Sequence, residues 1–171
     1  MTGAPSNPPQ TVLLTGVSGA GKSTVGRALA AAIDADLVDA DDLHPASNVE
    51  KMASGRALDD ADREPWIDRL VDELRRREAA GERVVLACSA LRRTHRRRLV
   101  GAVDDVAVVH LHVSADELRR RLSERTDHFM PAELLQSQLE SLESPEAHHA
   151  LVVDGDRPVA EVVDGIVSHW R

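Results

Sequence analysis

The chain has 171 residues and a formal net charge of −8, and 42% of its residues are hydrophobic. That length suits one domain with a proper core, and the apolar content excludes a disordered chain. The acidic balance argues against a general nucleic-acid binder, and no apolar run approaches the roughly 18 residues of a membrane span. The single cysteine, Cys88, excludes an internal disulfide and fits a reducing compartment, so we expect a cytoplasmic protein without nucleic-acid or membrane partners. Residues 1–10 carry three prolines and no apolar signal-peptide core, and we expect them to form a disordered arm before one domain over residues 11–171.

A glycine-rich loop follows the first predicted strand, Thr11–Thr15. It reads G-x-x-x-x-G-K-S and opens a segment with helical apolar spacing, which is the context that a phosphate-binding P-loop requires. Glycines let successive backbone N–H groups point at one anion, and the helix N-terminus adds partial positive charge. The lysine can reach the β- and γ-phosphates of a nucleotide, and the serine hydroxyl can hold Mg²⁺. The residues expected to contact the nucleotide are Gly16, Val17, Ser18, Gly19, Ala20, Gly21, Lys22, Ser23 and Thr24, with Lys22 also catalytic and Ser23 also a metal ligand.

An acidic loop follows the second predicted strand, Asp36–Asp39. A phosphotransferase needs one carboxylate to help hold Mg²⁺ and another to orient or deprotonate the attacking hydroxyl. Asp39 and Asp41 are two residues apart and therefore face the same side of an extended segment. The strand that ends at Cys88 has no aspartate at its end, where such kinases usually carry a metal-binding carboxylate, so Asp39 has to help hold Mg²⁺. Asp41 is then the candidate catalytic and substrate-binding carboxylate. The alternative is a solvated acidic loop that caps the next helix, and we assign no role to Asp42.

Cations after this loop are candidates for recognising the acceptor. Besides the P-loop lysine, Lys51 is the only lysine in the chain. A cation and a neutral histidine near the attacking hydroxyl suit a polyhydroxylated or anionic acceptor, which makes Lys51 and His44 candidate substrate contacts. Arg56 is a further candidate because a guanidinium can hold a carboxylate through two hydrogen bonds, and Arg92 is one because it follows a strand end close to the expected crevice. The alternatives are a surface histidine, a solvated lysine and solvated arginines at helix ends, and we expect a solvated helix face for Arg96–Arg98.

The remaining pattern alternates strands with helices. Ser47 with Glu50, and Ser114 with Glu117, match capping boxes, and Pro65 suits the first turn of a helix. Strands are expected at 84–88, 106–113 and 150–153, and helices at 47–52, 65–81, 94–100, 114–125, 131–142 and 158–171. This alternation predicts a three-layer α/β fold, with helices on both faces of a parallel sheet. Because ligands bind beyond the carboxyl ends of such strands, the loops that follow the strands should converge on one crevice.

An arginine-rich helix leads into a polar break at Thr126–Met130. This pattern predicts a mobile lid over about residues 120–132 that closes on the phosphates. A cation there would neutralise charge on the transferring phosphoryl group, and we assign that role to Arg125, with Arg121 as a second nucleotide contact. Some arginines of this segment must lie on the surface, because arginines at successive positions around a helix cannot all face inward.

The block D-x-D-x-L-H-P-x-x-N-x-x-K-M at residues 39–52 is specific, whereas a P-loop alone is not. Together with residues 58–66, 88–92, 125–130 and 134–145 it resembles the P-loop gluconokinases. The resemblance runs from Val12 to about Pro158 and thus covers nearly the whole chain.

The resemblance implies a P-loop kinase fold and ATP- and Mg²⁺-dependent phosphorylation of D-gluconate at its 6-hydroxyl, usually by a homodimer. It also implies that His128 and Gln138 contact the substrate and that the turn ending at Pro158 borders the adenine. A shikimate kinase, a nucleoside-monophosphate kinase or another small-molecule kinase of the same fold is one alternative, although their acceptor motifs differ. A GTPase-like switch is another, but its N-K-x-D base-reading motif is absent from this sequence.

Overall fold

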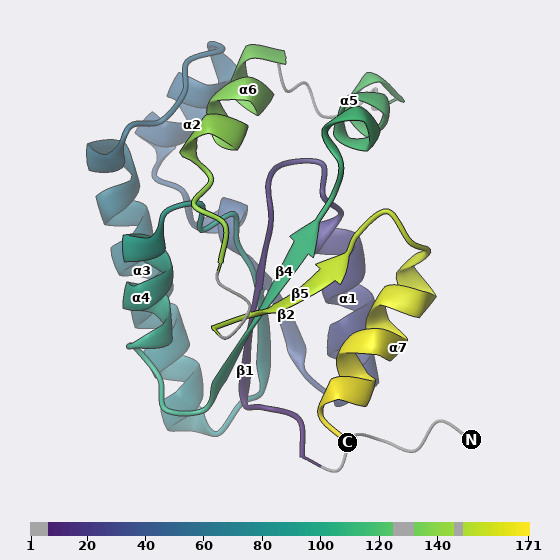
Figure 1. The fold of residues 1–171 in the computed structure, drawn as a ribbon. Helices are drawn as coiled ribbons and strands as arrows, with labels where there is room; N and C mark the ends of the chain where they lie inside the picture. Colours follow the sequence, from purple (N-terminus) through teal and green to yellow (C-terminus); the bar gives the residue numbers. More distant parts are fainter. Residues whose placement is uncertain (1–6, 125–131, 146–148) are drawn as a thin grey trace.

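A computed structural model of the chain describes residues 7–124, 132–145 and 149–171, and within them it shows a five-stranded parallel sheet (Figure 1). The strands are β1 (Thr11–Thr15), β2 (Asp36–Asp39), β3 (Val84–Ala87), β4 (Val106–His112) and β5 (Leu151–Asp154), in the order β2-β3-β1-β4-β5. The P-loop strand β1 lies in the middle and pairs with β3 on one side and β4 on the other. The predicted parallel α/β fold is therefore confirmed.

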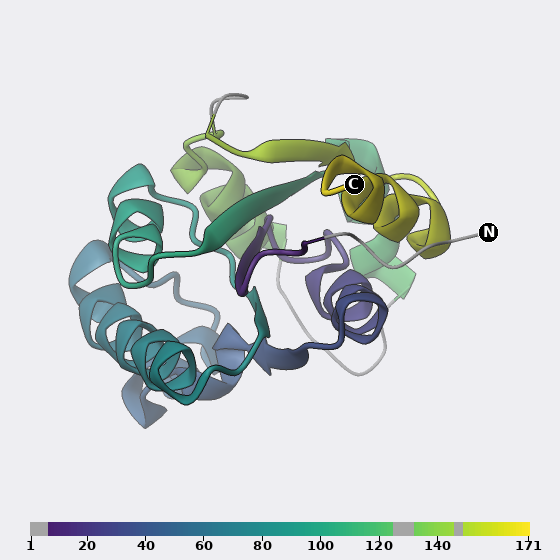
Figure 2. The same cartoon turned by 90° about the horizontal axis from the view of Figure 1, so that it is seen from below.

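Helices cover both faces of the sheet. One face carries α1 (Lys22–Ile33) and α7 (Val159–His169), and the other carries α3 (Asp60–Ala80) and α4 (Arg93–Val100), as Figure 2 shows. Above the carboxyl ends of the strands stand α2 (Ala46–Ala53), α5 (Ala115–Glu124) and α6 (Ala132–Ser141), and the short 3₁₀ helix η1 (Ala40–Leu43) follows β2 directly (Figure 1). None of the helices in the described ranges is long and apolar enough to cross a membrane.

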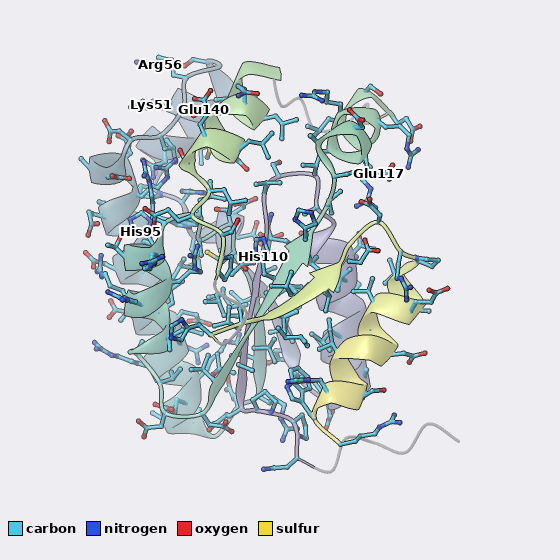
Figure 3. All side chains as sticks on the ribbon, in the orientation of Figure 1. Lys51, Arg56, His95, His110, Glu117 and Glu140 are labelled. Atoms are coloured by element: carbon cyan, nitrogen blue, oxygen red, sulfur yellow. The ribbon has the colours of Figure 1, made fainter. Side chains whose placement is uncertain are left out.

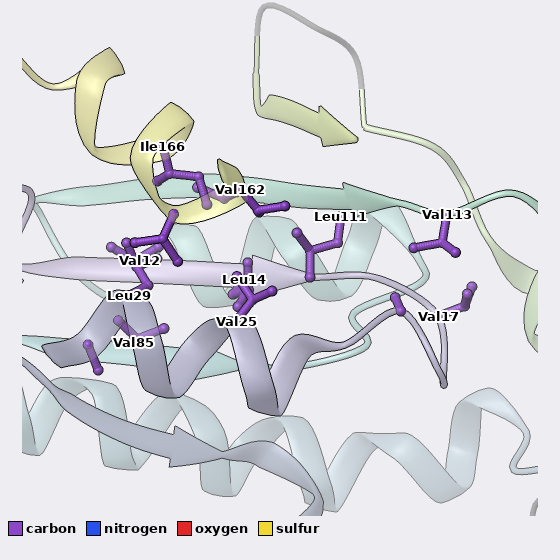
Figure 4. Close-up of a cluster of buried hydrophobic side chains, with 14 of the residues drawn as sticks. Val12, Leu14, Val17, Val25, Leu29, Val85, Leu111, Val113, Val162 and Ile166 are labelled. Carbon is purple, nitrogen blue, oxygen red and sulfur yellow. The ribbon is translucent and has the colours of Figure 1, made fainter. Parts of the chain in front are cut away.

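Alternate residues of β1 enter two separate cores, because successive side chains of a strand point to opposite faces. Val12 and Leu14 pack with Leu29 and Ile166 against α1 and α7 (Figure 4). Leu13 enters the second core, under α3 and α4. Full burial of such an aliphatic side chain contributes about 1.5–3 kcal/mol to the free energy of folding. Because β1 buries side chains on both faces, a shift in its register would disturb both cores. The loop that follows β1 is thus attached to a strand that is buried along its whole length.

Helix α3 begins earlier than predicted. A capping box made of two aspartates starts it: Asp59 accepts from the Asp62 amide at 2.8 Å, and Asp62 accepts from the Asp59 amide at 2.9 Å. Pro65 consequently lies inside the helix and not in its first turn. The prediction placed the start at the proline because this box contains aspartate at both positions, where the usual signature has Ser or Thr followed by Glu or Gln.

The two predicted capping boxes differ in outcome. The first is wrong, because α2 starts directly after Pro45 and no side chain caps it, so Ser47 already lies in the first turn. At the second, Ser114 Oγ does accept from the Glu117 amide at 3.3 Å. The Glu117 carboxylate does not complete that box: the Ser114 amide donates to Asp156 Oδ1 at 3.3 Å, and Glu117 accepts from Arg121 Nε at 2.7 Å.

The N-terminal arm expected over residues 1–10 is described from residue 7 onward. At its end, Gln10 is bonded to the sheet region: its amide donates to Asp105 Oδ2 at 2.8 Å, and its carbonyl accepts from the Val84 amide at 2.9 Å. These bonds fix the entry into β1.

Candidate active site

The P-loop joins β1 to α1 at the carboxyl edge of the sheet. Gly19 and Gly21 have φ angles of 84° and 93°, in the left-handed region that glycine enters most readily. Gly21 directly precedes α1, so the positive end of that helix lies at the loop. Lys22 Nζ donates to the Val17 carbonyl at 3.0 Å, which folds the lysine back over the loop. The loop therefore provides the backbone turn, the helix end and the cation that a polyphosphate needs.

Ser23 and Asp39, the two predicted metal ligands, are in direct contact. Ser23 Oγ donates to Asp39 Oδ2 at 2.8 Å, and the other carboxylate oxygen of Asp39 accepts from the Asp41 amide at 3.0 Å. Mg²⁺ prefers oxygen ligands, keeps several waters and is commonly held by one or two protein groups plus substrate phosphates. Within the described ranges, no cluster of three or more His, Cys, Asp or Glu could hold a metal ion by itself. The Ser23–Asp39 pair therefore fits a metal that arrives with the nucleotide.

A cavity of about 280 Å³ opens beside the P-loop, between α2, α3 and α6. The predicted site residues that line it are Ser18, Lys22, Asp41, His44 and Gln138. The P-loop lysine and the candidate base thus line one space, as transfer from a nucleotide to an acceptor would require. The lining also contains Arg63, Trp66 and Ser89, which the sequence analysis did not select.

His44 is held as a neutral side chain at the wall of this cavity. Its ring stacks on Trp66, with the ring centroids 4.2 Å apart and the planes 15° from parallel. Burial, and secondarily the charge of Arg63, lowers the pKa of His44 to about 4. Asn48 Nδ2 lies 3.3 Å from His44 Nδ1, which favours the tautomer with the ring proton on Nε2, 3.8 Å from Asp41 Oδ1. A neutral N–H donor therefore lies next to the candidate base.

Arg63 is a cation that the sequence analysis missed. It lies on α3 one turn before the buried Trp66, and its side chain is only 13% exposed. Its Nη1 donates to the exposed Asp60 at 3.3 Å, and its charge lowers the pKa of both His44 and the buried His95. The sequence could have revealed this position. Residues three apart lie on the same face of a helix, so an arginine three residues before a core tryptophan lies next to the buried face.

Three predicted acceptor contacts do not line the cavity in the described structure. Lys51 Nζ lies 2.5 Å from Asp62 Oδ2 and 3.8 Å from Asp59 Oδ2, so it ties α2 to the start of α3. Arg56 is exposed and donates to a neighbouring serine, and Figure 3 shows it with Lys51 at the outer side of α2. Arg92 lies within 4 Å of carboxylates on α3 and after α6. Their direct contact with a substrate stays a prediction.

Arg121 connects the P-loop to the turn after β5. Its Nη2 donates to the Gly155 carbonyl at 2.8 Å and its Nη1 to the Ala20 carbonyl at 3.3 Å. A Cβ on Gly155 would come within 2.6 Å of a Val113 methyl group, so the turn can approach the loop only as glycine. Pro158 follows as the residue before α7. The predicted convergence of this turn on the P-loop is thus confirmed, whereas contacts of Arg121 and Pro158 with a nucleotide stay predictions.

Gln138 reaches the P-loop from α6, because its Oε1 accepts from the Ser18 amide at 2.7 Å. It therefore lies at the junction of the loop and the cavity. Arg125 and His128, predicted as a catalytic lid residue and a substrate contact, lie outside the described residues, as does most of the predicted lid.

Two buried titratable side chains support the site without lining the cavity. Burial raises the pKa of the Cys88 thiol to about 12, so it behaves as a small apolar side chain. Burial lowers the pKa of His110 to about 4, and its Nδ1 lies 2.9 Å from Thr15 Oγ1 at the end of β1 (Figure 3). Both groups are uncharged at pH 7, and both lie beside the end of β1, where the P-loop begins.

Comparison with known proteins gives a consistent result. The family model described as an AAA domain matches residues 12–145. The chain is 42% identical to a gluconokinase of Gluconobacter oxydans, over 95% of this chain and 92% of that protein, and 37% identical to the thermosensitive gluconokinase of Escherichia coli, over 91% and 84%. The crystal structure of a gluconokinase from Sinorhizobium meliloti superposes with a TM-score of 0.85 at 41% identity, covering 95% of this chain and 91% of that one.

More distant structures share the fold alone. A shikimate kinase from Bacteroides thetaiotaomicron superposes with a TM-score of 0.71 at 21% identity, over 93% of this chain and 97% of that one. Identity near 40% over almost the full length of several relatives, together with the shared fold, shows the family: the chain belongs to the gluconokinase family.

Proposed function

We propose that this chain transfers the γ-phosphoryl group of ATP to the 6-hydroxyl of D-gluconate. The observation that carries the proposal is that Lys22 and Asp41 line one small cavity, in a chain whose relatives are named gluconokinases. In the reaction, the acceptor oxygen bonds to the γ-phosphorus, the bond from that phosphorus to the β-γ bridging oxygen breaks, and ADP leaves. Asp41 accepts the hydroxyl proton, and Lys22 neutralises charge on the phosphates.

Mg²⁺, when bound with ATP, would lower the charge repulsion between the phosphates and the acceptor oxygen. Ser23 and Asp39 would hold it, because their oxygens already lie 2.8 Å apart beside the P-loop. Asp39 is also fixed by the Asp41 amide, so the metal ligand and the candidate base are positioned by one short segment.

Gluconate carries one carboxylate and a chain of hydroxyls, and the cavity contains a candidate partner for both kinds of group. Arg63 is the described cation whose side chain is largely buried at this wall, so we assign the carboxylate to it. The Nε2–H of His44 is a neutral donor beside Asp41 and suits a hydroxyl. Trp66 keeps that ring in place by stacking and by donating from its Nε1 to the Ala40 carbonyl at 2.7 Å.

Lys51 acts on this cavity indirectly in our proposal. Its ammonium binds Asp62, whose backbone carbonyl accepts from Asn48 Nδ2 at 2.9 Å, and Asn48 in turn orients His44. The lysine therefore fixes the spacing between α2 and α3, and with it the position of the acceptor wall.

Replacement of Asp41 by asparagine tests the assignment. The amide keeps the shape but cannot take a proton, so kcat should fall by roughly 10²-fold or more while KM for gluconate changes little. Asp42→Asn is the matched control, since Asp42 is a neighbouring exposed carboxylate. Wild-type turnover in a folded Asp41→Asn protein would remove Asp41 from the chemistry.

A panel of acceptors separates the proposed substrate from the alternative. Turnover of gluconate, with none of shikimate, is expected from the family relationship, and the reverse result would contradict it. The homodimer and the cytoplasmic location stay predictions, and light scattering after size-exclusion chromatography would test the first.

A further inference from the structure

Two segments from distant parts of the chain contribute to the lining of the acceptor cavity. Ser89 and Leu91 belong to the turn that follows β3, whereas Leu134, Ser137 and Gln138 lie on α6. An acceptor is held in a reactive position only if the walls of its site are themselves fixed, and a displacement of about 1 Å can cost roughly 10²-fold in rate. Contacts that hold these two segments together can therefore affect catalysis from outside the cavity.

The guanidinium of Arg96, on α4, bonds to both segments. Arg96 was predicted to lie on a solvated helix face, but it is only 7% exposed. Its Nη1 donates to the carbonyls of Ala90 at 2.9 Å and Leu91 at 3.0 Å, and its Nη2 donates to the carbonyl of Glu143, two residues after the end of α6. Because a guanidinium is planar and presents its donors in a rigid fork, these bonds fix the three carbonyls relative to one another.

Glu143 bonds to the turn and to α4 through all of its polar groups. Besides its carbonyl, its amide donates to the Leu91 carbonyl at 2.9 Å, and its carboxylate accepts from the Arg93 amide at 2.5 Å. That amide is the first of α4, and the residue before it provides no side-chain cap. A carboxylate is stabilised at the N-terminus of a helix, so Glu143 caps α4 from a distant segment. The same bond lowers the pKa of the Glu143 carboxyl, which keeps the cap ionised.

The turn that these bonds hold is strained. Ala90 has a φ of 38°, in the left-handed region that is unfavourable for a residue with a Cβ. Such a conformation persists only where the surrounding structure holds it in place. Arg96 provides this support through its bonds to the Ala90 and Leu91 carbonyls. Loss of the support would let the turn relax and would move Ser89 and Leu91 in the cavity wall.

Helix α6 is held by apolar packing and by directional bonds. Leu135 is buried in the core under α1 and α7. Apolar contacts have no directional preference and leave a helix free to shift, whereas the hydrogen bonds at Gln138 and Glu143 have a defined geometry. Glu143 thus fixes the end of the helix from which Gln138 reaches the P-loop.

We propose that Arg96 and Glu143 are positioning residues for the phosphoryl acceptor, because together they fix the spacing between α6 and the turn after β3. Both are described residues outside the lining of the cavity, so they act through residues that line it, Leu91 on the turn and Gln138 on α6. This proposal rests on the proposed function, since its effect is measured on the acceptor. The alternative is a clamp that stabilises the fold and leaves acceptor binding unchanged.

Steady-state kinetics of Arg96→Met and Glu143→Ala separates these possibilities. Arg96→Met keeps the apolar stem but removes the three bonds to carbonyls, and we expect the KM for gluconate to rise about tenfold. Glu143→Ala keeps both backbone bonds, and the side chain that it removes is 45% exposed, so we expect a smaller increase of about fivefold. The KM for ATP should stay within about twofold of the wild-type value, because Lys22 and the P-loop glycines are unchanged.

Matched control variants change residues of the same type on the same helices. Arg97→Met alters an exposed arginine of α4, and Glu140→Ala alters an exposed glutamate of α6, which is labelled in Figure 3 and bonds to Gln136 within its own helix. Both should keep the wild-type KM for gluconate. Glu143→Gln is the conservative variant: its amide oxygen can still accept from the Arg93 amide, so its KM should lie closer to wild type than that of Glu143→Ala.

Circular dichroism and thermal unfolding show whether each variant is folded. A loss of folded protein lowers the apparent kcat but not the KM, so a purely structural clamp predicts unchanged KM values. A KM for gluconate within about twofold of wild type in folded Glu143→Ala, or an equal increase in the KM for ATP, would overturn the positioning role, whether or not Arg96→Met folds. Absence of gluconate phosphorylation by the wild-type protein would instead contradict the proposed function, so the two failures are distinguishable.

Discussion

Replacement of Arg63 by alanine is the sharpest test of how the acceptor is recognised. Arg63 lines the acceptor cavity and is the largely buried cation at its wall, next to the neutral His44. If its guanidinium holds the gluconate carboxylate, the variant should bind gluconate weakly and ATP normally, because the P-loop and Lys22 are untouched.

The expected magnitude follows from the environment of the side chain. A hydrogen bond to a charged partner contributes about 1.5–3 kcal/mol, which corresponds to a KM increase of roughly 10- to 150-fold. With 13% of the side chain exposed, solvent screening is small, but the exposed Asp60 at 3.3 Å already satisfies part of the charge. We therefore expect the lower end, roughly a tenfold increase in the KM for gluconate, and a smaller increase for Arg63→Lys.

Steady-state kinetics with each substrate varied in turn measures this effect. Arg75→Ala is the matched control, because Arg75 is an exposed arginine on the same helix. NMR titration gives a second readout: removal of the Arg63 charge should raise the pKa of His44 from about 4, although burial, the larger cause, should keep it below 6.5. If the KM for gluconate in folded Arg63→Ala stays within twofold of the wild-type value, the reasoning is refuted. A cation other than Arg63 must then bind the carboxylate.

Two further predictions concern the metal and the α2–α3 contact. Asp39→Asn should raise the Mg²⁺ concentration needed for half-maximal rate roughly tenfold, whereas Asp42→Asn should not, and equal Mg²⁺ dependence would exclude Asp39 from the metal site. Lys51→Met should lower stability by roughly 1 kcal/mol and raise the KM for gluconate but not that for ATP. Because Lys51 acts through Asp62, the Lys51→Met/Asp62→Asn double variant should show a KM effect no larger than the greater single effect, and strictly additive effects would contradict this.

The features that the sequence predicted well are those in which neighbouring residues act together. The P-loop and the Ser23–Asp39 pair follow from contiguous motifs and from the rule that parallel strands end at one edge. The sheet follows from alternation of apolar runs with helical spacing, and the structure confirms it. The positions of these residues follow from neighbouring sequence and from strand geometry, so they can be predicted without knowing which distant segments contact each other.

The features that the sequence did not predict depend on pairs of elements. Lys51 was assigned to a substrate, and its Asp62 partner became visible only when α2 and α3 were placed side by side. Arg96 was assigned to solvent because arginines are usually exposed, yet its guanidinium is buried between the loop before its own helix and the carbonyl of Glu143, which follows α6. The unusual two-aspartate cap starts α3 at Asp60, so Arg63 lies within this helix and not before the predicted start at residue 65.

The bond between Ser18 and Gln138 has a consequence for the order of events during turnover. A backbone N–H group donates well to only one acceptor at a time. The N–H of Ser18 donates to Gln138 Oε1 at 2.7 Å. A γ-phosphate that arrives in the P-loop is a stronger acceptor for the same hydrogen. If the nucleotide takes this hydrogen, as we expect, Gln138 is released from the loop and its side chain can turn toward the acceptor.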